Sequence, residues 1–136
     1  MFLSVFDMFK VGIGPSSSHT IGPMVAAARF LDHLRAQPFK VAGLRASLHG
    51  SLAFTGVGHA TDRATILGLA GFRADDYDRE KADAEMARID RDGWVAPEGL
   101  DQLTFVTKDH VEFDYGKFGR RFYRSFCCRF ECRGFL

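Results

Sequence analysis

Residues 44–50, LRASLHG, alternate apolar and polar side chains. Alternation of this kind predicts a β-strand that buries one of its two faces. Before this strand, apolar residues recur every three or four positions, which predicts a helix that starts at Ile21 and ends before Pro38. Ser18 or Thr20 is the expected N-cap of this helix. Its apolar stripe consists of Ile21, Met24, Val25, Ala28 and Leu31.

The residues after this strand predict a second long helix and several shorter elements. Residues 50–59 are rich in glycine and are interpreted as a loop. Thr61 or Asp62 is then expected to cap a helix that closes at Gly71. Further predictions are a short helix over residues 1–11, an exposed helix over 75–92 and a β-hairpin formed by 103–106 and 111–113. The mixture of helices and short strands predicts one domain of the α/β class in a mixed α+β arrangement.

Length and composition are those of one globular domain. The chain has 136 residues, of which 46% are hydrophobic and 26% are charged, and this balance argues against disorder and against a fibrous protein. No uninterrupted apolar stretch is long enough to span a membrane, so we expect no membrane contact. The first residues lack the basic start and the cleavage site of a secretory signal, which favours a cytoplasmic location.

Charge and cysteine are concentrated at the carboxyl end. Residues 1–116 carry a net charge of −4 and residues 117–136 one of +5, and Cys127, Cys128 and Cys132 all lie in the second stretch. Their spacing is not that of a ferredoxin cluster. The alternating basic and aromatic residues are a weak case for nucleic-acid binding, and we expect no such partner. We therefore expect a truncated domain over 1–116 and an atypical, poorly ordered tail over 117–136.

Residues 12–20, GIGPSSSHT, are interpreted as a loop that leads into the first long helix. The amino end of a helix offers unpaired N–H groups and a positive dipole, which suit a carboxylate or a phosphate. His19 adds a group that exchanges a proton near neutral pH. The hydroxyl-bearing residues are Ser16, Ser17, Ser18 and Thr20. Alternatively, the serines only cap the helix and His19 lies on the surface.

A second junction, residues 49–62, has a similar composition. His59 lies just before the second long helix, next to Gly58 and Thr61, and Ser51 follows the strand. Two junctions that each carry a histidine beside hydroxyl groups predict one shared polar pocket. Alternatively, they are two independent helix starts with incidental histidines. The histidines lack the spacing of known zinc motifs, so no metal site is predicted in this chain.

Residues 4–24 and 49–71 resemble, in this order, two signature segments of the β domain or β chain of bacterial iron–sulfur L-serine dehydratases. The resemblance covers residues 2–115. It implies a domain similar to the allosteric substrate-binding domain of phosphoglycerate dehydrogenase, packed on a separate helical α domain that holds a 4Fe-4S cluster. It also implies conversion of L-serine to pyruvate and ammonia. We further expect a homodimer.

The resemblance also implies roles for individual residues. His59 and His19 are the expected catalytic residues, one of them transferring a proton. The expected substrate-binding residues are Ser16, Ser17, Ser18, Thr20, Ser51, Gly58 and Thr61. Because residues 1–116 contain no cysteine, the cluster is expected on the α domain, and the isolated chain is expected to be inactive. The alternative is a regulatory module that binds serine or another anion without catalysis.

Overall fold

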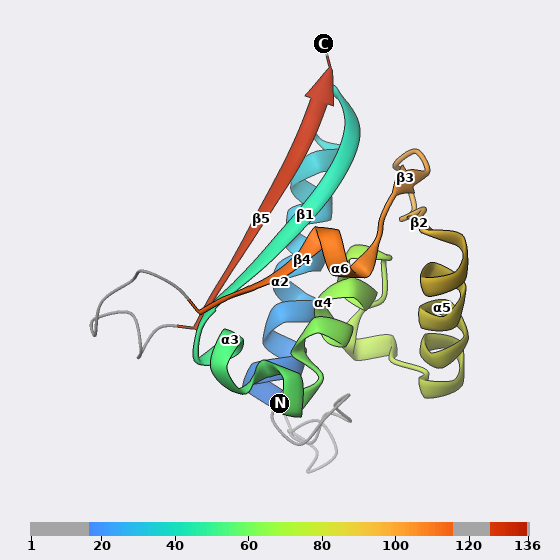
Figure 1. Ribbon diagram of the computed structural model, residues 1–136. Helices are drawn as coiled ribbons and strands as arrows, with labels where there is room; N and C mark the ends of the chain where they lie inside the picture. Colours follow the sequence, from blue (N-terminus) through green and yellow to red (C-terminus); the bar gives the residue numbers. More distant parts are fainter. Residues whose placement is uncertain (1–16, 116–125, 136) are drawn as a thin grey trace, which may run out of the picture.

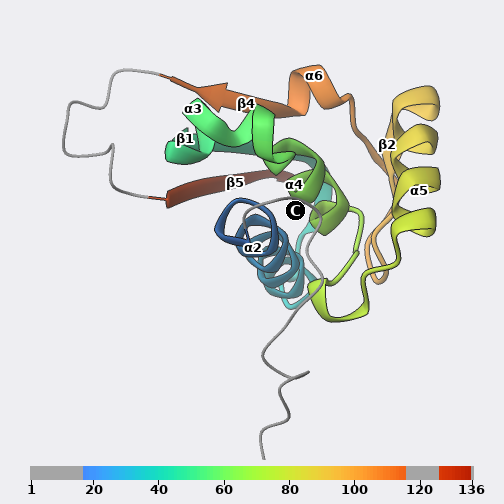
Figure 2. The ribbon, with the colours of Figure 1, turned by 90° about the horizontal axis from the view of Figure 1, so that it is seen from below.

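The computed structural model describes residues 17–115 and 126–135. These residues form the predicted mixed α+β domain, in which a three-stranded sheet packs against α2 (Ser17–Arg35) and α4 (Thr61–Leu69). Figure 2 shows the two helices side by side next to the strands, with α5 (Arg79–Asp92) at the periphery. The helix expected over 1–11 lies outside the described residues. None of the described helices has the length and hydropathy that a membrane span requires.

The central strand of the sheet is β1 (Lys40–Gly50), which confirms the strand predicted from residues 44–50. It pairs in parallel with β4 (Val111–Asp114) and antiparallel with β5 (Phe126–Phe135), as Figure 1 shows. A bulge between Val41 and Gly43 shifts the register against β5. The side chains of β1 that are buried against the helices are those of Val41, Leu44, Ala46 and Leu48.

The two long helices approach each other closely at Gly68 of α4. A Cβ atom built on Gly68 would lie 2.7 Å from the Cβ of Ala27 and 2.9 Å from the carbonyl oxygen of Met24, both on α2. Because carbon atoms in van der Waals contact are normally about 3.5–4.0 Å apart, only glycine allows this approach. The contact joins the middle of α2 to the last turn of α4.

Both predicted loops are partly helical, and these two predictions are wrong within the described residues. Helix α2 begins at Ser17, so Pro23 lies inside the helix and not in its first turn. The segment after β1 contains α3 (Ser51–Gly56) and the 3₁₀ turn η1 (Val57–His59). Buried contacts explain both differences, because His19 and Thr20 of α2 and Leu52 and Ala53 of α3 all lie in the interior. Such packing overrides weak local helix propensity.

The cap of α4 also differs from the prediction. The N-cap is Ala60 and neither Thr61 nor Asp62, and Ala60 has a left-handed conformation with a φ of 56°. This residue turns the chain sharply between η1 and α4. Gly56, just before that turn, has no room for a side chain, since its Cβ would lie 2.9 Å from the ring of Phe113.

The predicted β-hairpin is wrong. Strand β3 (Leu103–Thr104) pairs with β2 (Trp94–Val95), whereas β4 joins β1, and the short helix α6 (Thr107–His110) separates β3 from β4. The exposed helix predicted over 75–92 is confirmed as α5, preceded by the 3₁₀ turn η2 (Ala74–Asp76). Its apolar face consists of Ala82, Met86 and Ile89.

Part of the expected tail lies in the sheet. Phe126–Phe135 form β5, which pairs with β1 along nearly its whole length, and this differs from the poorly ordered tail expected over 117–136. The ring of Phe130 stacks on Phe30 of α2 with the centroids 5.3 Å apart. Strand β5 is thus bonded to β1 and packed on α2.

Candidate functional site

The two junctions that carry the predicted site residues lie at the same end of the molecule. Figure 1 shows α3 and the start of α4 beside the amino end of α2. The hydrogen bond between Thr55 and His19 and the contact between the rings of His19 and His59 join the two junctions. Residues 51–61 therefore face the first turn of α2, although some thirty residues separate them in the sequence.

The rings of His19 and His59 are in contact. Their centroids are 4.9 Å apart and the ring planes are inclined by 56°. His19 is buried, with 8% of its surface exposed, and His59 is half-buried. The fold thus brings the two predicted catalytic side chains together, while their catalytic roles stay predictions.

A chain of hydrogen bonds runs through His19. The hydroxyl of Ser18 lies 3.0 Å from Nδ1 of His19, and the hydroxyl of Thr55 lies 2.9 Å from Nε2. Thr55 in turn donates its hydroxyl hydrogen to the carbonyl oxygen of Ser51, at 2.7 Å. These contacts hold the ring in one orientation between α2 and α3.

Three buried polar atoms between residues 51 and 61 have no hydrogen-bond partner among the described residues. They are Oγ of Ser51, Nδ1 of His59 and Oγ1 of Thr61. Leaving a buried donor or acceptor unpaired costs about 1–3 kcal/mol, so a group that supplied the missing bonds would be stabilised here. All three belong to residues of the predicted site.

The other predicted site residues have different surroundings. Thr20 is fully buried, whereas Ser18 is exposed and its hydroxyl contacts His19. Gly58 is exposed, and a side chain added there would meet open space. Ser16 lies outside the described residues, and Ser17 is the first residue of α2. Their roles in substrate binding stay predictions.

Two polar residues near these junctions are absent from the predicted site. Thr55 is one, and no sequence signal identifies it, because the composition of residues 50–59 predicts a loop and not the helix that contains Thr55. The other is Asp114, whose carboxylate lies 3.2 Å from Nδ1 of His49. His49 and Asp114 are paired in register across β1 and β4, and this parallel pairing has no signal in the sequence.

The described residues do not fit an iron–sulfur cluster. Such clusters are held by several cysteine thiolates, and Cys132 is the one cysteine whose side chain the structure describes. Within residues 17–115 and 126–135, no three histidine, cysteine or acidic side chains converge on a point where a metal ion could bind. A cluster would have to be held elsewhere.

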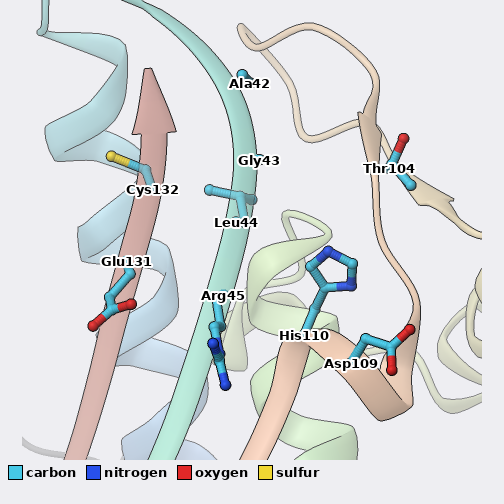
Figure 3. A pocket seen from close by; sticks show the side chains of 9 residues that line it. All are labelled: Ala42, Gly43, Leu44, Arg45, Thr104, Asp109, His110, Glu131 and Cys132. Atoms are coloured by element: carbon cyan, nitrogen blue, oxygen red, sulfur yellow. The ribbon is translucent and has the colours of Figure 1, made fainter.

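A separate cavity of about 340 Å³ lies along the other half of β1 (Figure 3). It borders residues 42–45, where β4 no longer pairs with β1, and Figure 3 shows Thr104 and His110 across from this edge. None of the predicted site residues lines it. The histidine pair and this cavity are therefore distinct features of the domain.

Comparison with known proteins gives a consistent result. Residues 4–130 match the family model described as serine dehydratase beta chain, a match that extends beyond the boundary expected at residue 116. The chain is 44% identical over 113 residues to an L-serine dehydratase of Streptomyces coelicolor, which covers 82% of the chain and 25% of that protein. It is 40% identical over 116 residues to an L-serine dehydratase of Helicobacter pylori, covering 84% of the chain and 23% of that protein. The chain thus spans about a quarter of the length of these curated relatives.

Proposed function

The chain belongs to the family of serine dehydratase beta chains, and on this basis we propose that it is the substrate-binding part of an enzyme that converts L-serine to pyruvate and ammonia. In this reaction serine loses the proton from Cα and the hydroxyl group from Cβ, together as water. The resulting enamine takes up water and releases ammonia, which leaves pyruvate. A base must therefore accept the weakly acidic Cα proton, and donors must hold the carboxylate.

His59 is the proposed proton acceptor. Its Nδ1 atom is buried and has no partner among the described residues, so it can accept a proton in the tautomer that carries hydrogen at Nε2. His19 differs, because both of its ring nitrogens contact hydroxyl groups. We assign His19 the role of holding and polarising the His59 ring, which it touches. The single observation that carries the proposal is this ring contact beside three unpartnered polar atoms.

The hydroxyl groups of Ser51 and Thr61 are the proposed contacts of the substrate. Both are buried and lack partners among the described residues, so a carboxylate or an amino group would supply the missing hydrogen bonds. The serines at 16, 17 and 18 and the hydroxyl of Thr20 complete the proposed carboxylate site at the start of α2.

The rest of the enzyme is proposed to lie outside this chain. Because the described residues do not fit a 4Fe-4S cluster, we assign the cluster to the α domain, in the part of the relatives that this chain does not match. The isolated chain is then inactive. A homodimer and a cytoplasmic location stay predictions.

A chimera tests this proposal. The matching quarter of the Streptomyces coelicolor L-serine dehydratase is replaced by this chain, and pyruvate formation from L-serine is measured. His59→Asn keeps a polar side chain of similar shape and removes the base, so we expect kcat to fall by about 10²–10⁴-fold. The control is His33→Asn, since His33 is exposed on α2, where its Nε2 atom contacts the side chain of Gln37.

Two outcomes would contradict the proposal. Full activity of the chimera that carries His59→Asn would exclude His59 as the base. Binding of L-serine by the chain, combined with activity that does not depend on His59, would instead support the alternative of a regulatory module.

A further inference from the structure

The hydroxyl group of Thr55 makes two contacts that together determine where His19 carries its hydrogen. Thr55 donates to the carbonyl oxygen of Ser51 at 2.7 Å, and the same oxygen lies 2.9 Å from Nε2 of His19. A hydroxyl group has one hydrogen and two lone pairs. Since the hydrogen is already donated to Ser51, the contact with His19 must use a lone pair. Nε2 of His19 therefore carries a hydrogen and donates it to Thr55.

The lone pair of the neutral ring then lies on its other nitrogen. With a hydrogen held at Nε2, neutral His19 has its lone pair at Nδ1, which lies 3.0 Å from the hydroxyl of Ser18. Ser18 belongs to the serine run at the start of α2. A hydrogen bond at one ring nitrogen of a histidine thus determines whether the other nitrogen carries the hydrogen or the lone pair.

We propose that Thr55 is a positioning residue of this site, which holds His19 in the form with hydrogen at Nε2 and the lone pair at Nδ1, on the side of Ser18. This inference rests on the proposed function, in that it treats His19 as part of the substrate site. The hydrogen position itself can nevertheless be measured without catalysis.

The opposite arrangement requires the Thr55 hydroxyl to turn away from Ser51 and donate to His19. A comparison within the chain argues against it. Thr65 of α4 also donates its hydroxyl to the carbonyl four residues earlier, that of Thr61, and again at 2.7 Å. Threonine in a helix makes this contact by itself, since the hydroxyl of Thr65 has no histidine as a hydrogen-bond partner among the described residues. Thr55 therefore keeps its hydrogen on the Ser51 carbonyl and offers a lone pair to His19.

Nitrogen-15 NMR of the histidine rings in the full 136-residue chain tests the proposal. Long-range proton–nitrogen correlation distinguishes a protonated ring nitrogen from one with a lone pair. We expect Nε2 of neutral His19 to be protonated and Nδ1 to have the lone pair. The reverse pattern in the unmodified chain would overturn the proposal, and this measurement needs no variant.

Three variants extend the test. Thr55→Val keeps the shape of the side chain but removes the acceptor, so we expect the hydrogen of His19 to be shared between both nitrogens, and Thr55→Ser to restore the original pattern. Thr65→Val is the matched control, because it removes the same kind of intrahelical bond and should leave the His19 signals unchanged. An unaltered His19 pattern in folded Thr55→Val would also overturn the proposal.

Activity separates this inference from the proposed function. In the chimera described above, we expect Thr55→Val to lower kcat by about tenfold, with recovery in Thr55→Ser, a loss typical of a group that orients a histidine. A chimera without activity would contradict the proposed function and leave the NMR result standing. Full activity of Thr55→Val, with an altered His19 pattern, would overturn the positioning role.

Discussion

Replacing Gly68 with alanine tests whether the contact between α2 and α4 holds the two junctions together. The new Cβ would lie 2.7 Å from Cβ of Ala27, and 2.9 and 3.1 Å from the carbonyl oxygen and Cα of Met24. Two of these atoms belong to the backbone of α2 and the third is attached directly to it. None can move without the helix, so α2 and α4 must separate by about 1 Å to reach normal contact distances.

The magnitude follows from two opposing effects. Forcing a methyl group into a packed interior costs about 1–3 kcal/mol. Alanine is also the better helix former by about 1 kcal/mol. We therefore expect Gly68→Ala to lower the free energy of unfolding by up to about 2 kcal/mol, whereas helix propensity alone would raise it.

Urea unfolding followed by circular dichroism measures this difference. The propensity effect is obtained separately from Ala84→Gly, because Ala84 is exposed in the middle of α5. Ala27→Gly removes the nearest clashing atom, so the double variant Gly68→Ala with Ala27→Gly should lose less stability than the sum of the two single losses. A Gly68→Ala chain that is about 1 kcal/mol more stable than the parent would refute the close helix contact, since helix propensity alone predicts that gain.

Two further predictions concern the flanking elements. Gly56→Ala places a methyl group 2.9 Å from the ring of Phe113. Because a ring can turn aside, we expect a smaller loss of stability in urea unfolding than for Gly68→Ala. A gain in stability would contradict the close packing of Gly56 against Phe113. The backbone N–H of Lys81 donates to Asp78 at the start of α5 and lowers the pKa of its carboxyl. This contribution to stability is therefore present above about pH 4 and is lost as the pH falls through the lowered pKa. Asp78→Asn keeps the cap but has no carboxyl to titrate, so we expect its thermal stability to fall less on acidification than that of the parent chain. Identical acid profiles for the two chains would rule out this contribution.

The elements with a strong period could be predicted from the sequence. The alternation in residues 44–50 and the apolar face of α5 each indicate which side of an element is buried. The helical stripe after Ile21 does so in part, since Met24, Ala28 and Leu31 are buried whereas Val25 is 37% exposed. A repeated pattern of this kind arises because one side of the helix or strand packs against a neighbouring surface. The two histidine-bearing junctions could likewise be identified, since their composition is unusual and local.

The ends and partners of these elements could not be predicted in the same way. The turn from Ser17 to Thr20 contains residues that favour loops, and it is helical because His19 and Thr20 are buried by distant parts of the chain. Strand β4 has as good a pattern for a hairpin with β3 as for its actual pairing with β1. A period shows that a face is buried and contains no information on what covers it.

The sequence by itself determined the mixed class of the domain, its main helices and central strand, and the kinds of side chain at its two junctions. Only the tertiary structure decided that the rings of His19 and His59 touch, and that Thr55 of α3 contacts His19 of α2. The reason is that these contacts depend on how the helices pack together. The close approach of α2 to α4, for example, is possible because Gly68 has no side chain. Local sequence patterns indicate the secondary structure, whereas the packing of the whole core sets the distances between segments that are far apart in the chain.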